Sequence, residues 1–196
     1  SHDAFLREYQ TLRDAGYYCV DIEALEEDGV LRWDGIFKKG PGGAAIWRNY
    51  DFDGFNAKWN EMIDAGFRLI DLETYTVNGQ RRWAGLFRPG SGKHALWRGY
   101  STEEFATKRE EMAASGRKLV DIEVYNTSEG LRWSGVWAEG EDGLLNRNYE
   151  RGEFLTLALS RASDGWVLLD VETYFVGDTQ YYAGIWERSE FMTGKT

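Results

Sequence analysis

The sequence predicts an α+β fold of four tandem helix-β-β-β repeats. The strands are expected to form one curved antiparallel sheet, a half or nearly closed barrel, with the helices on its outer face. Two observations lead to this prediction. The motif Gly-x-x-x-[Val/Ile/Leu]-Asp-[Ile/Leu/Val]-Glu starts at Gly16, Gly66, Gly116 and Gly165, at spacings of 50, 50 and 49 residues, and such a period indicates a repeat architecture. In addition, the apolar period changes in each repeat from about 3.6 before the glycine to 2 after it.

Each repeat begins with a predicted amphipathic helix. In the second repeat Phe55, Trp59 and Met62 are four and then three residues apart and form one apolar stripe. Ser101 and Glu104 have the spacing of a capping box at the start of the third helix. The recurring glycine follows the helix, where a left-handed backbone conformation closes the last turn. We therefore expect the glycine to end each helix.

Two strands joined by a tight turn are predicted after each glycine. In the first strand, side chains alternate between a face with Asp, Glu and Tyr and an apolar face that we expect against the helices. Asp28-Gly29 and Asn78-Gly79 indicate hairpin turns. The second strand carries an aromatic, Gly, aromatic series on one face, as in residues 83–87, and small residues on the other. We expect the helices to pack closely on these small residues (Ala84, Ser134 and Ala183).

A glycine-rich loop then leads to a third, short strand in three of the repeats. This strand ends Trp47-Arg48-Asn49-Tyr50 in the first repeat, and the fourth repeat lacks it. The prediction is therefore about eleven antiparallel strands. We expect residues 1–196 to be a single repeat domain with units of about 1–50, 51–100, 101–149 and 150–196.

Composition and charge exclude several classes of function. The chain of 196 residues is 42% hydrophobic and 15% aromatic, which is enough for a core, and its formal net charge of −10 argues against a nucleic-acid partner. No run of eighteen apolar residues is present, so we expect no membrane partner. Cys19 is the only cysteine, which excludes an internal disulfide and indicates a small core residue.

Residues 67–75, Phe-Arg-Leu-Ile-Asp-Leu-Glu-Thr-Tyr, and 80–87, Gln-Arg-Arg-Trp-Ala-Gly-Leu-Phe, carry a family resemblance. They resemble the bacterial tandem repeats found beside the peptidase domain of polyglycine hydrolases, and the resemblance covers essentially the whole chain. It implies a half-barrel of β-hairpins backed by helices, acting as a binding or positioning module rather than as the catalyst. It also favours a secreted or periplasmic location, although a cytoplasmic one remains open.

The Asp-x-Glu pairs are the main candidate site. Asp and Glu two residues apart on a strand share a face, so a curled sheet would line a concave face with carboxylates beside aromatic rings. Arginines recur on the third strands, and charges that are buried must be paired. The candidate ligand-binding residues are Asp21, Glu23, Asp71, Glu73, Tyr75, Asp121, Glu123, Tyr125, Asp170, Glu172, Tyr174, Trp33, Trp83, Trp133, Arg48, Arg98 and Arg147.

Several functions are compatible with this face. A carboxylate–arginine ladder would fix strand register, an open groove would hold a small molecule, glycan or peptide, and oxygen ligands could bind calcium. No cofactor is predicted apart from that calcium alternative, and no catalytic residue is assigned. The leading hypothesis is a non-enzymatic binding module. The alternatives are a carboxylate-dependent hydrolase of a glycan or peptide and a purely structural appended domain.

Overall fold

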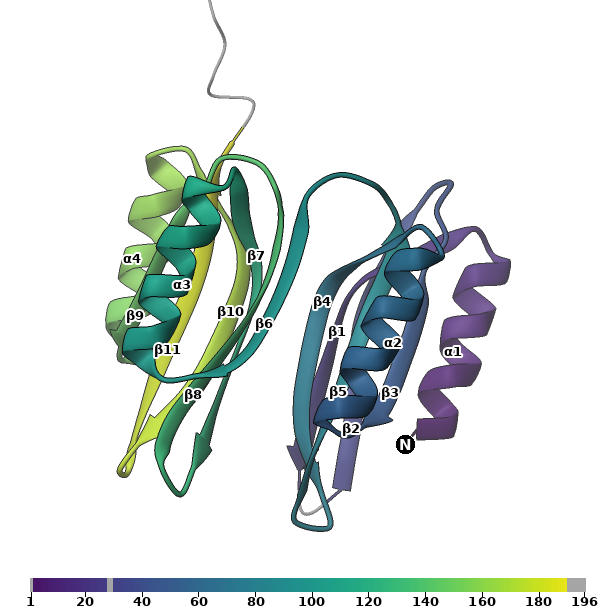
Figure 1. The fold of residues 1–196 in the computed structure, drawn as a ribbon, viewed down its shortest axis with the longest axis horizontal. Helices are drawn as coiled ribbons and strands as arrows, with labels where there is room; N and C mark the ends of the chain where they lie inside the picture. The colour runs from purple at the N-terminus through teal and green to yellow at the C-terminus, as the bar shows by residue number, and fades with distance from the viewer. Residues whose placement is uncertain (1, 28–29, 190–196) are drawn as a thin grey trace, which may run out of the picture. The chain divides into compact units, whose positions relative to one another are not determined.

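The computed structural model describes residues 2–27 and 30–189, which contain four helices and eleven strands (Figure 1). The helices are α1 (His2–Asp14), α2 (Phe52–Asp64), α3 (Thr102–Ala114) and α4 (Arg151–Ser163). The long strands are β1 (Tyr17–Glu27), β2 (Val30–Lys39), β4 (Phe67–Val77), β5 (Gln80–Pro89), β7 (Arg117–Thr127), β8 (Gly130–Glu139), β10 (Trp166–Val176) and β11 (Thr179–Arg188). The short third strands are β3 (Ala45–Tyr50), β6 (His94–Tyr100) and β9 (Leu144–Tyr149). This order confirms the predicted α+β repeats.

The helix boundaries follow the local sequence signals. The predicted capping box at α3 is present, because Ser101 Oγ accepts from the N–H of Glu104 at 3.3 Å and Glu104 Oε2 accepts from the N–H of Ser101 at 2.8 Å. Each recurring glycine follows a helix with a positive φ, such as 83° at Gly66. A side chain strains that conformation, so glycine ends the helix there.

The predicted hairpin turn at Asn78-Gly79 is confirmed. Their φ angles are 51° and 74°, the left-handed pair that a tight β-hairpin turn requires. The corresponding prediction at Asp28-Gly29 lies outside the described residues.

The strands form four small sheets instead of one curved sheet. Their strand orders are β1-β2, β3-β5-β4, β6-β8-β7 and β9-β11-β10, and the pairs are antiparallel. The expectation of one continuous sheet that closes or nearly closes into a barrel is therefore wrong. Where β1 lies beside β4, side-chain carboxylates of β4 accept hydrogen bonds from backbone N–H groups of β1. In a continuous sheet, backbone carbonyls of the neighbouring strand would accept these hydrogen bonds.

Each third strand pairs within the sheet of the following repeat. β3 pairs with β5, with Trp47 opposite Gly85 and Tyr50 opposite Trp83. The same arrangement joins β6 to β8 and β9 to β11. A complete sheet thus combines the third strand of one repeat with the hairpin of the next. In the part of the chain that is described, the first hairpin alone has no third strand.

The chain divides into two compact units, residues 1–91 and 92–196. The first contains α1, α2 and the strands β1 to β5, and the second contains α3, α4 and the strands β6 to β11. In each unit the two sheets meet along the first strands of their hairpins, β1 beside β4 and β7 beside β10.

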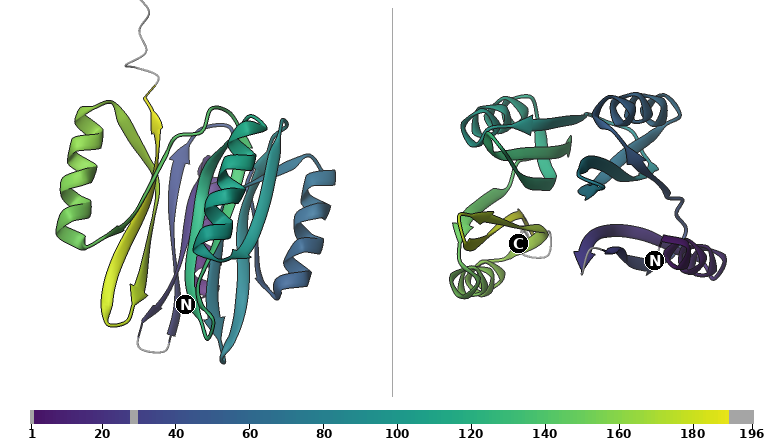
Figure 2. Two further views of the ribbon diagram at one scale, coloured as in Figure 1. Left: turned by 60° about the vertical axis from the view of Figure 1, so that its left-hand side comes forward. Right: turned by 90° about the horizontal axis from the view of Figure 1, so that it is seen from below.

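Each helix covers the aromatic face of its hairpin (Figure 2). In the second sheet Phe55 of α2 lies 6.3 Å from Phe87, measured between ring centroids. A Cβ placed on Gly85 would meet Leu69 Cδ1 at 2.5 Å and Phe55 Cζ at 2.8 Å, so glycine makes this close approach possible. The prediction that the helices pack on the opposite face, against Ala84, is therefore wrong. Ala84 stands opposite Glu73 on the face turned toward β1.

Candidate functional site

Carboxylates of one repeat bind the backbone of the preceding repeat. In the first unit Asp71 Oδ2 accepts a hydrogen bond from the N–H of Ile22 at 2.5 Å, and Glu73 Oε2 accepts one from the N–H of Ala24 at 2.8 Å. In the second unit Asp170 Oδ2 accepts one from the N–H of Ile122 at 2.9 Å. Hydrogen bonds to an ionised acceptor are stronger than neutral ones. We call this junction between the first strands of consecutive repeats the seam.

A one-residue β-bulge directs these carboxylates into the seam. The register of β4 against β5 shifts between Leu69 and Asp71, and the other hairpins shift at the equivalent place. Uninterrupted alternation, which we expected, would place Leu69 and Asp71 on the same face. The extra residue instead turns Leu69 toward α2 and leaves Asp71 facing β1.

Aromatic rings and arginine form the second part of the seam. The ring of Trp33 meets that of Tyr75 edge-on, with 5.2 Å between centroids. The guanidinium carbon of Arg48 lies 4.8 Å from the Trp33 ring centroid, within the range of a cation–π interaction. The second unit repeats this cluster with 5.5 Å between the rings of Trp133 and Tyr174, and 5.4 Å from Arg147 to the Trp133 ring. The cluster therefore belongs to the seam in both units.

The tyrosine hydroxyls fix the third strands to the seam. The N–H of Asn49 donates to Tyr75 Oη at 2.9 Å, and the N–H of Asn148 donates to Tyr174 Oη at the same distance. Tyr174 Oη in turn donates to Asn148 Oδ1 at 2.8 Å. Both asparagines have a left-handed backbone, with φ of 67° and 66°, which asparagine tolerates better than most residues.

Burial controls the ionisation of this cluster. Desolvation raises the pKa of the Tyr75 and Tyr174 hydroxyls above the usual tyrosine value, and the backbone N–H groups of Asn49 and Asn148 oppose part of that effect. Desolvation also lowers the pKa of the Arg48 guanidinium, while its interaction with Tyr75 raises it. The hydroxyls therefore remain protonated at neutral pH, so they are suited to hydrogen bonding and not to proton abstraction.

The predicted site residues differ in their exposure to solvent. Asp71 and Glu73 are only 3% and 6% exposed, and their carboxylates are occupied by backbone N–H groups. Also buried are Asp121, Glu123, Arg98, Trp33, Trp83, Trp133, Tyr75 and Tyr174. Half-buried are Asp21, Glu23, Tyr125, Asp170, Glu172, Arg48 and Arg147. The structure thus brings Trp33, Arg48 and Tyr75 together, beside the carboxylates that bind β1.

The second unit contains a polar pocket that the sequence analysis does not predict. It has a volume of about 470 Å³ and is lined by the 141–143 loop and by Lys118, Trp166, Glu187 and Arg188. Lys118 Nζ pairs with Glu187 Oε2 at 2.5 Å, and the guanidinium carbon of Arg188 lies 4.1 Å from the Trp166 ring centroid. The only available signal was Trp166, which stands where the earlier repeats have Tyr17, Phe67 and Arg117.

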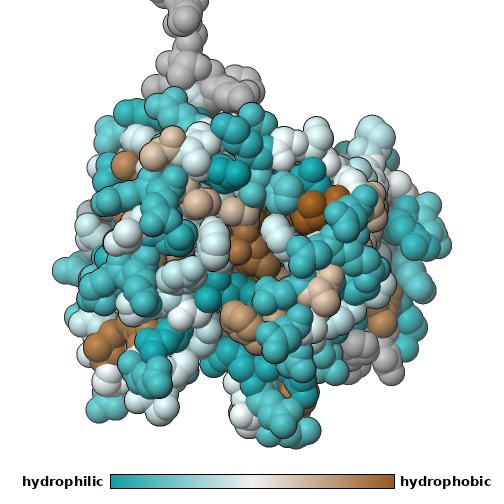
Figure 3. Space-filling view, viewed as in Figure 1, coloured by the Kyte–Doolittle hydropathy of each residue, from teal (hydrophilic) through white to brown (hydrophobic). Residues whose placement is uncertain are grey.

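The described part of the chain shows neither a metal-binding cluster nor a helix that could cross a membrane. There, no group of three or more His, Cys, Asp or Glu side chains is arranged to hold a metal ion. None of its helices combines the length and apolar character that crossing a membrane requires. The face in Figure 3 is mostly hydrophilic, with small hydrophobic areas between polar side chains.

Comparisons with known proteins agree with the repeat architecture. The family model described as polyglycine hydrolase-like, structural repeat matches four times, at residues 1–40, 42–89, 94–140 and 148–189. No curated protein and no solved structure matches the chain. The four matches follow the four helix-hairpin groups of the structure.

Proposed function

Because the chain belongs to the polyglycine hydrolase-like structural repeat family, we propose that it is a non-enzymatic scaffold. In this role the two repeats of each unit hold one another through the seam and position what is joined to them or bound on their surface. One observation carries the proposal: the carboxylates of Asp71 and Glu73 accept backbone N–H groups of the preceding repeat. The most regular chemical feature of the sequence is thus used to join repeats.

The environment of these carboxylates supports a structural role over a catalytic one. A hydrolase that uses a carboxylate pair needs one carboxyl group to protonate the leaving group and another to act as base or nucleophile, and both must reach the substrate. Asp71 and Glu73 are buried and already accept hydrogen bonds. Releasing either one would leave a backbone N–H without its acceptor, which is costly inside a protein.

The test compares the variant Asp71→Ala with its counterpart Asp21→Ala, which changes the same place in the preceding repeat. A scaffold predicts that Asp71→Ala lowers the urea midpoint of unfolding well below that of Asp21→Ala. Both proteins and the wild type would also be titrated with a panel of glycans and peptides while Trp fluorescence is recorded. If the first variant kept wild-type stability but lost a ligand-dependent fluorescence change, the scaffold proposal would be overturned and a binding groove supported.

A second candidate function is ligand binding in the polar pocket beside Trp166. Its volume of about 470 Å³ falls within the range of about 300–1,000 Å³ common for small-molecule sites. The lining combines the Trp166 indole, on which Arg188 stacks, with the charged groups of Lys118 and Glu187, and such a lining suits a small polar ligand. Thermal-shift measurements with monosaccharides and amino acids test this candidate. A shift that Trp166→Ala abolishes supports binding there, and a shift unaffected by that change excludes this pocket.

A further inference from the structure

A small cavity lies between α3 and β9, within the second unit. It has a volume of about 240 Å³. Its α3 wall consists of Ala106, Arg109, Glu110 and Ala113, and the remaining lining consists of Asp142, Leu145 and Arg147. Sites for drug-sized ligands measure about 300–1,000 Å³, so a ligand that fits this cavity is smaller.

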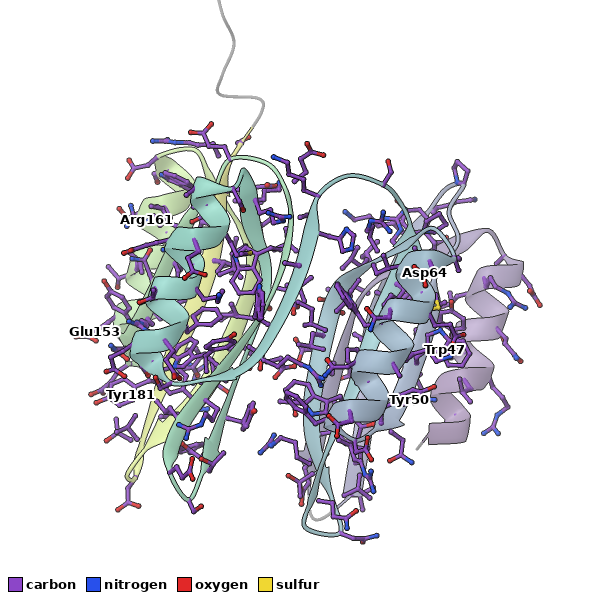
Figure 4. All side chains as sticks on the ribbon, viewed as in Figure 1. Trp47, Tyr50, Asp64, Glu153, Arg161 and Tyr181 are labelled. Atoms are coloured by element: carbon purple, nitrogen blue, oxygen red, sulfur yellow. The ribbon has the colours of Figure 1, made fainter. Side chains whose placement is uncertain are left out.

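The alternation of the third strand turns Leu145 and Arg147 toward α3. In β3, Trp47 lies against α2 of the following repeat, where Figure 4 labels it. The neighbouring Arg48 faces the helix of its own repeat, with its guanidinium carbon 5.7 Å from the ring centroid of Phe5 in α1. Successive side chains of a strand point to opposite faces. Arg147 has the place of Arg48 in the third repeat and therefore lines the space beside α3.

The α3 wall departs from the pattern of the other repeats. Ala106 and Ala113 stand where the first repeat has Leu6 and Arg13, and the smaller side chains leave room between the helix and the strand. Glu110 stands where the other three helices have Gln, Asn and Leu. Side chains that only pack one repeat on another should be similar in every repeat. The departures concentrated on this cavity therefore indicate a role of the third repeat alone.

Two of the four charged groups around the cavity already pair with each other. Arg109 Nη2 lies 2.8 Å from Asp142 Oδ2 and donates a hydrogen bond to the carbonyl oxygen of Gly143 at 2.8 Å. Asp142 Oδ1 accepts a hydrogen bond from the N–H of Leu119 at 3.1 Å. These contacts fix the 141–143 loop beside α3.

The other two charged groups, Arg147 and Glu110, form no ion pair within residues 2–27 and 30–189. The guanidinium of Arg147 contacts the Trp133 ring, and the Glu110 side chain is exposed. Arg147 Nη1 and Arg109 Nε are both buried and have no hydrogen-bond acceptor. A buried N–H group without an acceptor is costly. A carboxylate is a suitable acceptor, because its two oxygens bind guanidinium groups strongly.

We propose that this cavity binds a small zwitterion, a molecule of the amino-acid class with one ammonium and one carboxylate group. The carboxylate of the ligand meets the guanidinium groups of Arg147 and Arg109, and its ammonium group meets the Glu110 carboxylate. The aliphatic part lies on Leu145 and the two alanines of α3. Such binding goes beyond the scaffold role, which requires no ligand.

The test titrates the full chain with alanine, β-alanine and 4-aminobutyrate in a calorimeter. These three zwitterions differ in the separation of their charges, so the tightest binder reports the spacing that the cavity accepts. Propionate and propylamine are the controls, because each is of similar size and carries only one of the two charges. The best zwitterion should bind the wild type at least about tenfold more tightly than either control.

Three variants of α3 locate the ligand. Ala106→Leu restores the side chain of the first repeat and fills the cavity, so binding of the zwitterion should weaken at least about tenfold. Glu110→Gln removes one exposed charge, so it should weaken the zwitterion about fivefold and leave propionate binding no weaker. Glu103→Gln makes the same change on an exposed residue outside the cavity and should have no effect. Circular dichroism verifies that all three variants fold.

Nitrogen-15 NMR spectra add a readout at the site itself. The Nε–H signal of Arg109 should shift as the zwitterion is added, because this group gains an acceptor. A shift confined to the indole signal of Trp166 would place the ligand in the polar pocket beside Trp166 and contradict the site proposed.

Three further results would overturn the proposal. The first is the absence of binding by all three zwitterions. The second is equally tight binding of propionate or propylamine to the wild type, which would show that one charge is sufficient. The third is an affinity that Ala106→Leu leaves unchanged, because the ligand would then lie elsewhere.

Discussion

Removal of the Asp71 carboxylate should destabilise the first unit much more than removal of the equivalent Asp21 carboxylate. The two residues have the same place in consecutive repeats, and both changes to Ala alter strand propensity alike. Asp71 accepts the N–H of Ile22 at 2.5 Å, whereas desolvation by burial raises the pKa of the Asp21 carboxyl. The comparison therefore isolates the contribution of the seam.

The magnitude follows from the hydrogen bond that is lost. In Asp71→Ala the N–H of Ile22, a residue that is 0% exposed, loses its acceptor. A hydrogen bond to a charged group contributes about 1.5–3 kcal/mol, and an orphaned buried donor costs about 1–3 kcal/mol. These values describe the same event and do not add, so we expect a loss of about 2–3 kcal/mol in the free energy of unfolding.

Asp21 should behave in the opposite way. Desolvation raises the pKa of its carboxyl, which means that the folded state disfavours the ionised form. A raised folded-state pKa contributes stability at low pH that is lost as the pH rises through that pKa. Asp21→Ala lacks this loss, so at pH 7 its free energy of unfolding should lie within about 0.5 kcal/mol of the wild type or above it.

Urea unfolding at pH 7, followed by Trp fluorescence and circular dichroism, measures both variants. With a slope of about 1–3 kcal/mol per molar urea, Asp71→Ala should shift the midpoint by about 1 M. Hydrogen exchange at the Ile22 amide should also accelerate in this variant. The reasoning is refuted if the two variants lose the same stability, or if Asp71→Ala leaves both the midpoint and the Ile22 exchange rate unchanged.

Three further predictions concern single side chains. Gly85→Ala should cost about 1–3 kcal/mol of unfolding free energy through overpacking, whereas Gly152→Ala, at a helical position with open space around it, should be neutral or stabilising. Burial raises the pKa of the Cys19 thiol to about 12, so this thiol should react with a maleimide only after the protein unfolds. The contribution of the neutral Cys19 thiol to the free energy of unfolding should fall as the pH rises from the unfolded-state pKa toward 12. Tyr75→Phe orphans one backbone N–H and should cost about 1 kcal/mol in urea unfolding, with Tyr17→Phe as the control.

The local structure was predictable because it is encoded by neighbouring residues. The spacing of Phe55, Trp59 and Met62 identified α2, and Gly66 marked its end. Asn78-Gly79 identified the hairpin turn. These signals depend on backbone conformation and on a single amphipathic face, and the sequence carries both directly.

The pairing between repeats was not predictable in the same way. A single bulge after Leu69 reversed the face on which that residue lies, and no residue type requires a bulge there. Which hairpin a third strand joins depends on the path of the loop, so β3 looked like the end of its own repeat. The sequence shows the carboxylates as a recurring feature. That they accept hydrogen bonds from backbone N–H groups of β1 can be known only from the position of β1 in the tertiary structure.

Each third strand is synthesised before the hairpin with which it pairs. β3 leaves the ribosome before its partner β5, with α2 and β4 between them in the sequence. Each sheet can therefore close only after the hairpin of the following repeat has been made, so order should spread from the amino end toward the carboxyl end one repeat at a time. A nascent chain that stalls after β3 would hold an unpaired strand until translation resumes.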